Sequence, residues 1–389
     1  MDTIPDGALS LLHVYEDAGQ PAPMKTYSRL IAALFRIPSS LTCAQAWDLF
    51  SHMRYVAHPQ PDALLYTQMI HACALPTPAE PERALDLFME MTIDRGIAPT
   101  AGAYNAAILA CARAGSKAYV NEAFRLAKEM LDSHRDARGH AAFRPDSWTF
   151  NALLEGAKRI GDLGRARWIL AEMVEAARQN VQSRDVVVDE KIMTHVFHAY
   201  AAYRPPFNRS MAPLVDTTEG DAEDAATSSV NHEPSSPVET SSQEPSFAHL
   251  PPQSSSEVIA EVRALFSRIP HISSPLGAGT DLPTLPDVHV TPRVLNAYLS
   301  VFYAHASLEM AHETFRTVFA DAGLKKDAHT LVEALERCAH ARRGPERTTV
   351  VGFAEEAWRE WVMLKNAQPE VGARHVQRAY AARIRILAL

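Results

Sequence analysis

The chain has 389 residues, of which 47% are hydrophobic and 8% aromatic, and its formal net charge is −8. A single compact core rarely grows past about 300 residues, so this length predicts several domains or an extended repeat array. The acidic balance argues against a general nucleic-acid binder, and the lack of an uninterrupted apolar run of about 18 residues predicts no transmembrane helix.

The first segment, 1–23, is predicted to hold one helix of a partial repeat. Ala8, Leu12 and Tyr15 lie at i, i+4 and i+7, which is the spacing of one helical face. The segment holds four acids and no base before Lys25, whereas a mitochondrial presequence is rich in Arg and poor in acids. Either this end carries no targeting signal, or further sequence precedes it.

Paired helices are predicted throughout 24–205. Each pair joins a first helix, such as "GAYNAAILAC" or "WTFNALLEGA", to a second helix with an apolar i, i+4, i+7 face. Those faces are Ala46–Phe50–Met53, Ala84–Phe88–Met91, Ala123–Ala127–Met130 and Ala166–Leu170–Met173. One helical hairpin cannot bury its apolar face alone, so the pattern predicts an all-α solenoid of stacked helix-turn-helix units.

Short proline segments separate the units, as at Pro61-Asp62, Pro99-Thr100 and Pro145-Asp146. Proline ends one helix, and the Asp or Thr after it is suited to cap the next.

Candidate metal and catalytic residues are few. Cys73, Cys111 and Cys338 take equivalent places in three first helices, which favours packing over metal binding because free Cys behaves as a small hydrophobe. His195 and His198 stand at i, i+3 with no evident third ligand. Phosphate-loop, HExxH and nucleophile-elbow motifs are missing, so we expect no enzyme activity, metal or cofactor.

The array is interrupted over 206–256, which holds eight acids and one base and is rich in Ser and Pro. Such a composition cannot bury enough surface to fold, so a disordered acidic insertion is predicted inside one repeat. Further degenerate repeats are predicted over 257–370. A basic helix, either capping or the start of an incomplete unit, is predicted over 371–389.

The segments "YNAAILACARAG" and "FNALLEGAKRIGDLGRARWILAEM", each followed by a Pro-Asp or similar tail, resemble the pentatricopeptide repeat consensus. The resemblance extends from Lys25 to about Asp189 and more weakly to the C-terminus, and its long, irregular units are more similar to fungal or animal mitochondrial members than to regular plant ones. It implies sequence-selective binding of single-stranded RNA, one base per repeat, with a role in mitochondrial RNA processing, stability or translation.

The resemblance also implies which residues read bases: a polar residue after the first helix's aromatic residue, paired with the last tail residue. Asn-Asp pairs in the family favour uracil and Ser/Thr-Asp pairs favour guanine, and apolar residues two places before the reader are expected to sandwich the base. Carried onto this chain, the pairs are Ser28 with Asp62, Thr67 with Thr100, Asn105 with Asp146, Asn151 with Asp189 and Asn296 with Asp327, while Thr194 has no clear partner.

Two other interpretations stay open. Asp and Asn are common caps and turn residues, so a single pair has a purely structural explanation. The near-neutral repeats and their irregular lengths also fit a protein-binding scaffold, for example one docked on the mitochondrial ribosome.

Overall fold

A computed structural model describes residues 7–20, 22–37, 39–58, 60–133, 135, 141–179, 186–206, 250–270, 285–341, 347–368, 370 and 372–388. Most of the predicted acidic insertion, 207–249, lies outside these residues. Within the described part the secondary structure is helical apart from one isolated β-bridge between Arg135 and Ala141. None of the described helices combines the length and apolar character that a membrane span needs.

The helices follow one another in pairs. Their bounds are α1 (Ala8–Asp17), α2 (Met24–Arg36), α3 (Ser40–His52), α4 (Ala63–Ala72), α5 (Pro81–Met89), α6 (Ala101–Ala114), α7 (Lys117–Asp132), α8 (Ser147–Ile160), α9 (Leu163–Gln179), α10 (Glu190–Ala202), α11 (Ser255–Ser267), α12 (Pro292–His305), α13 (Leu308–Asp321), α14 (Ala328–Ala339), α15 (Arg347–Ala367) and α16 (Ala373–Ala388), with π-helical turns η1 (Met53–Ala57) and η2 (Glu90–Asp94) after α3 and α5.

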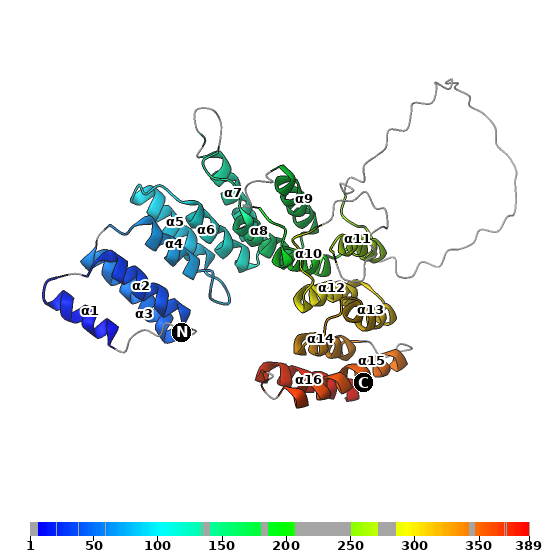
Figure 1. Ribbon diagram of the computed structural model, residues 1–389. Helices are drawn as coiled ribbons and strands as arrows, with labels where there is room; N and C mark the ends of the chain where they lie inside the picture. Colours follow the sequence, from blue (N-terminus) through cyan, green and yellow to red (C-terminus); the bar gives the residue numbers. More distant parts are fainter. Residues whose placement is uncertain are drawn as a thin grey trace, which may run out of the picture.

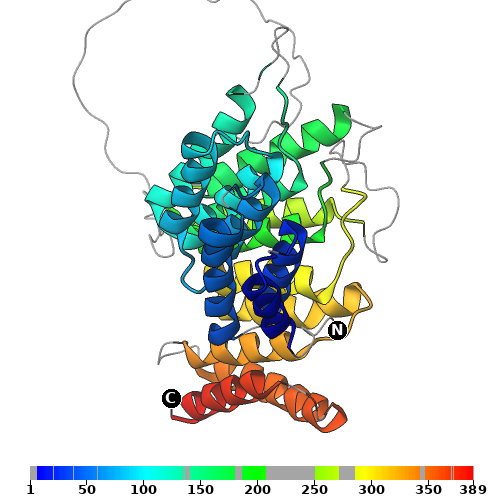
Figure 2. The same ribbon diagram turned by 90° about the vertical axis from the view of Figure 1, so that its left-hand side faces the viewer.

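The pairs stack into an arch, which confirms the α-solenoid prediction (Figure 1). First helices pack on one another in the row α4, α6, α8, α10, α12, α14, and α16 packs on α14 at the end of the row. From α8 onward the second helices α9, α11, α13 and α15 lie on the outer side of the arch (Figure 1). Figure 2 shows the array from its N-terminal side, with the blue helices α1–α3 nearest the viewer.

The apolar i, i+4, i+7 faces form the core between the two helices of each unit. Ala166 and Met173 in α9 are fully buried, and Leu170 is only 2% exposed. The other three strong copies of the pattern are buried in the same way. The pattern fails in α1, where Leu12 is buried but Tyr15 is 53% exposed. Glu16 instead links α1 to its neighbours, because it accepts hydrogen bonds from Tyr27 in α2 and His52 in α3.

Caps and turns set the helix boundaries as expected. The tail residues Asp62, Thr100, Asp146, Asp189 and Asp327 each cap the next first helix by accepting its third backbone N–H. Gly161 ends α8 with φ +67°, and a Cβ there would lie 2.8 Å from the Ala202 carbonyl oxygen. Only glycine therefore fits where α8 turns back beneath the end of α10.

The three equivalent cysteines are buried packing residues. Cys73, Cys111 and Cys338 have no disulfide partner, and burial raises the pKa of each thiol to about 12. The helices on either side of the interrupting segment form one hairpin: Tyr200 in α10 donates to Glu261 in α11 over 2.8 Å, and Phe197 contacts the Phe266 ring.

Candidate functional site

A groove of about 760 Å³ crosses the first helices α2, α4, α6, α8 and α10. Its lining includes four of the predicted reader and tail residues: Thr67, Asn105, Asp146 and Asn151. Ser28, Asp62, Thr100, Asp189, Thr194, Asn296 and Asp327 lie outside it. The groove runs along the row of first helices, which pack on one another across successive units.

Aromatic and basic side chains join the polar ones in the groove. Trp148, at the start of α8, is 71% exposed, and the Lys191 ammonium lies 5.4 Å from its ring centroid. Arg36 and Arg113 also line the groove, and Arg113 donates to the Ala74 carbonyl over 3.1 Å. A flat exposed ring beside cationic groups is the combination that binds bases and phosphates of single-stranded nucleic acid.

Asn105 and Asp146 are brought together across the α6–α8 junction. The Asn105 Nδ2 donates to Asp146 Oδ1 over 3.2 Å, and the Thr149 hydroxyl donates to Asn105 Oδ1 over 2.6 Å. Thr149 also belongs to the capping box of α8, in which Asp146 Oδ1 accepts from the Thr149 backbone N–H over 2.8 Å. The pair is therefore both a cap and a fixed polar cluster at the edge of the groove.

The same cluster recurs at the α12–α14 junction. Asn296 Nδ2 donates to Asp327 Oδ1 over 3.2 Å, and the Thr330 hydroxyl donates to Asn296 Oδ1 over 2.7 Å. Burial opposes ionisation of Asp327, but the hydrogen bonds from Thr330 and Asn296 outweigh it and hold the pKa of Asp327 below its ordinary 3.8. Unlike Asn105, Asn296 is only 4% exposed and lines no part of the groove.

Asn151 and Asp189 form no hydrogen bond, although the sequence pairs them. Asn151 Nδ2 donates back to the Ser147 carbonyl over 3.0 Å, and its buried Oδ1 has no partner. Asp189 caps α10 through the Ile192 backbone N–H at 2.9 Å. The expected cluster does not form here, and the position of Thr149 and Thr330 is taken by an isoleucine.

The remaining reader residues turn their hydroxyls into their own helices. Ser28 donates to the Met24 carbonyl over 3.2 Å, Thr67 to the Ala63 carbonyl over 2.7 Å, and Thr194 to the Glu190 carbonyl over 2.7 Å. Ser28 and Thr194 are buried, so only Thr67 of the three reaches the groove.

The expectation that residues two places before the reader sandwich a base is wrong for every reader except Ser28, where Thr26 is exposed. Leu65, Ala103, Thr149, Ile192 and Val294 are all fully buried, because that side of each first helix packs into the hairpin core. The residue one step earlier faces outward instead, as Leu64 (61% exposed) and Trp148 show. Adjacent residues of an α-helix are rotated by about 100° from each other, so a shift of one position separates the outward face from the buried face. The helical spacing could therefore have identified the outward residue from the sequence.

Several arginines outside the groove form ion pairs with nearby carboxylates. Arg125 binds Glu122 and Glu129, Arg159 binds Glu155, and Arg167 binds Glu261. In the C-terminal helix Arg378 binds Glu336 and Arg383 binds Glu355.

His195 closes the α10 end of the groove. Its Nδ1 lies 2.9 Å from the Lys158 Nζ, and its Nε2 lies 3.8 Å from Glu155 Oε2. Burial, together with the Lys158 charge, lowers the pKa of His195 to about 3, so the ring is neutral and accepts from the ammonium. Among the described residues no group of His, Cys, Asp and Glu is arranged to hold a metal ion.

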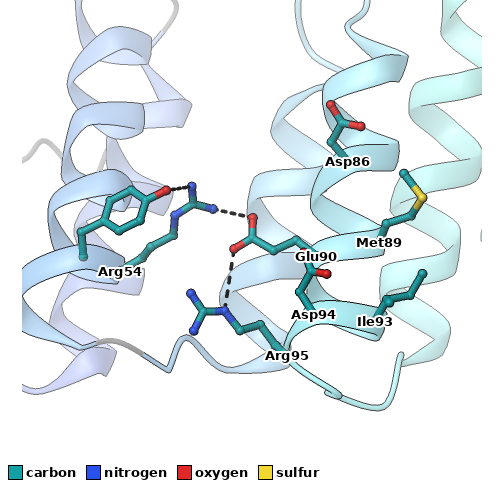
Figure 3. Close-up of a pocket in the computed structure, with 8 residues that line it drawn as sticks. Arg54, Asp86, Met89, Glu90, Ile93, Asp94 and Arg95 are labelled. Atoms are coloured by element: carbon teal, nitrogen blue, oxygen red, sulfur yellow. Dashed lines mark hydrogen bonds and ion pairs between the residues drawn. The ribbon is translucent and has the colours of Figure 1, made fainter.

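A second pocket, of about 660 Å³, lies between η1 and the α5–η2 helix (Figure 3). Glu90 stands at its centre and binds Arg54 at 2.6 Å and Arg95 at 3.9 Å. Exposed apolar side chains surround these ion pairs: Tyr55 is 68% exposed, Met89 49% and Ile93 73%. This pocket combines apolar and charged groups on the second helices of two neighbouring units.

No family model matches the sequence. A chloroplastic pentatricopeptide repeat-containing protein of Arabidopsis thaliana is 30% identical over 170 residues, which is 44% of this chain and 20% of that protein. Among solved structures, the maize pentatricopeptide repeat protein PPR10 gives a TM-score of 0.46 at 15% identity, over 94% of this chain and 41% of PPR10. PPR10 in complex with an 18-nt psaJ RNA element gives 0.43 at 14% identity, over 92% of this chain and 42% of PPR10.

The chain thus spans about a fifth of the length of the curated relative that it matches. The matched stretch of 170 residues is long enough to include several of the hairpin units. In its repeated sequence pattern, its stacked hairpins and this match, the chain is similar to pentatricopeptide repeat proteins.

Proposed function

We propose that the chain binds a single-stranded stretch of RNA along the groove of its first helices. The observation that carries the proposal is the groove itself, where Asn105, Asp146 and Asn151 lie beside the exposed Trp148 ring and the cations of Arg113 and Lys191. Asn side chains offer both donors and acceptors to a base edge, a ring stacks on the base, and the cations meet the phosphates.

The readers are proposed to act selectively, one base per repeat. In this proposal Asn105 with Asp146 favours uracil, and the neighbouring Asn151, which also lines the groove, lies at the next base. Ser28, Thr194 and Asn296 are buried, so the contacted stretch centres on α4, α6 and α8. The maize protein PPR10, whose complex with an RNA element is known, supports this choice of ligand.

The cellular role proposed is in RNA processing, stability or translation in mitochondria. The support is the irregular length of the units, which resembles fungal and animal mitochondrial members, while the Arabidopsis relative is named as chloroplastic. Both are organelles that express their own transcripts. Imaging of the tagged full-length protein decides between the two compartments.

The binding test uses the intact chain and short RNA, DNA and duplex competitors. We expect single-stranded RNA to bind most tightly, and Trp148→Ala to weaken binding by about 10-fold, since stacking on an aromatic ring contributes roughly 1–3 kcal/mol per base. Trp168→Ala is the matched control, because Trp168 in α9 is also exposed (57%) but lies away from the groove. Equal affinity of the two variants and the unaltered chain contradicts the proposal.

A protein-binding scaffold, for example on the mitochondrial ribosome, is the second candidate. It is favoured by the pocket around Glu90, where Tyr55, Met89 and Ile93 leave apolar surface exposed beside the unpaired carboxylates of Asp86 and Asp94 (Figure 3). Exposed apolar surface rimmed by charges is typical of protein contacts. Purification of the tagged chain with and without ribonuclease separates a protein partner from an RNA one.

A further inference from the structure

The two junctions at which an Asn meets a tail Asp share a third member. At the first, the Thr149 hydroxyl lies 2.6 Å from Asn105 Oδ1 and 2.9 Å from Asp146 Oδ1. At the second, the Thr330 hydroxyl lies 2.7 Å from Asn296 Oδ1 and 2.8 Å from Asp327 Oδ1. In both cases the Thr stands three residues after the Asp, in the first turn of the following unit's first helix.

The third Asn-Asp junction lacks this Thr and lacks the pairing. Ile192 stands three residues after Asp189, and it offers no hydroxyl. Asn151 turns its Nδ2 to the Ser147 carbonyl instead, and its Oδ1 is left buried without a hydrogen bond. Within one molecule, therefore, the Asn-Asp hydrogen bond is present where the Thr is present and absent where it is replaced by Ile.

The hydrogen-bond chemistry explains the dependence. The Thr149 oxygen accepts from the Asp146 backbone N–H over 3.2 Å, so its single proton is directed at the cluster, where Asn105 Oδ1 is its nearest acceptor. A flipped Asn105 amide would place its oxygen against the Asp146 carboxylate. The Thr thus fixes the orientation of the amide and leaves one Nδ2 hydrogen and one Oδ1 lone pair for a ligand.

We infer that the residue three positions after the tail Asp, supplied by the next repeat, is a positioning residue that sets how sharply an Asn reader selects its base. The inference rests on the proposed RNA binding. Thr149 fills this role for Asn105, which lines the groove, whereas Thr330 holds a buried Asn296 and acts on stability alone.

The loss-of-function test is Thr149→Val, which keeps the branched shape in a fully buried position and removes the hydroxyl. The unaltered chain and each variant are used to select from a pool of randomised single-stranded RNA. We expect the uridine preference at one position to fall about fivefold, the effect of one hydrogen bond, with the other positions unchanged. Thr149→Ser should restore the preference, and Thr330→Val should leave all positions as they were.

Asn105→Ala separates the inference from the function on which it rests. If Asn105→Ala abolishes the preference and Thr149→Val leaves it intact, the positioning role is wrong while RNA reading stands. If Asn105→Ala changes nothing, the reader function is wrong and the inference falls with it.

The gain-of-function test is Ile192→Thr. Threonine is already accommodated at the two equivalent buried positions, so we expect the variant to fold, with helicity checked by circular dichroism. The hydroxyl should draw Asn151 to Asp189 and raise the uridine preference at the base adjacent to that of Asn105 about fivefold. A folded Ile192→Thr chain with no raised preference contradicts the inference. If Ile192→Thr does not fold, the Thr149→Val and Thr149→Ser variants still test the inference.

Discussion

The junctions around Asn105 and Asn296 contain the same three side chains in nearly the same geometry, yet they occupy different surroundings. Asn105 lines a groove open to ligand, and Asn296 is 4% exposed. The hydrogen-bond lengths at the two junctions agree within about 0.1 Å. The two junctions therefore differ in how far the neighbouring helices cover the Asn side chain. We therefore expect this cluster to act as a reader only where the inner face is open, and as a structural element elsewhere.

The largest effect expected from this contrast is on stability. Asp327→Ala removes a helix cap and leaves the buried Asn296 Nδ2 and the Thr330 backbone N–H without their acceptor, which should cost about 2–4 kcal/mol in the free energy of unfolding. Asp146→Ala should cost only about 1–2 kcal/mol, because water from the groove can replace the lost bonds around Asn105. Urea unfolding followed by circular dichroism measures both, and equal losses would show that the two clusters are equally enclosed.

The change from open to covered inner face occurs at α10, where His195 ends the groove. Its pKa is lowered to about 3 in the folded chain against an ordinary 6.5, so the unfolded chain takes up the proton first as the pH falls. Stability from this group is complete above pH 6.5 and is lost as the pH falls toward 3. We expect about 1–2 kcal/mol to be lost between pH 6.5 and pH 5.

His195→Asn is the matching variant, since the Asn oxygen can accept from Lys158 and does not titrate. Its urea midpoint should fall less than that of the unaltered chain over the same pH range. The slope should not vanish, because burial also lowers the pKa of His71, His198 and His305. Parallel curves for the two chains would show that His195 is not the group that couples this junction to pH.

The fold followed from the sequence because its signals are local. The Ala-x3-apolar-x2-Met faces predicted the buried side of the second helices. The three proline tails predicted the caps at Asp62, Thr100 and Asp146, which the structure confirms. Tyr15 departs from the pattern because spacing alone does not tell how much of a helix face its neighbours cover.

The site was less accessible to sequence reasoning because it depends on contacts between units. The repeat alignment made Asn151 equivalent to Asn105 as a reader. The Asn151 amide instead turns to Ser147, because Ile192, 41 residues farther along the chain, offers no hydroxyl. Trp148 was overlooked because the stacking position was placed one residue away, on the buried face of α8. An error of one residue rotates a helical position by about 100°, which is enough to exchange core for groove.

The most direct test of the account compares Asn105→Ala with Asn296→Ala in selection from a randomised single-stranded RNA pool. We expect Asn105→Ala to lose a uridine preference of roughly 10-fold at one position, equivalent to about 1.4 kcal/mol. Asn296→Ala should keep the unaltered chain's preferences at every position. A uridine preference lost with Asn296→Ala, or kept with Asn105→Ala, would contradict the claim that exposure to the groove makes an Asn a reader.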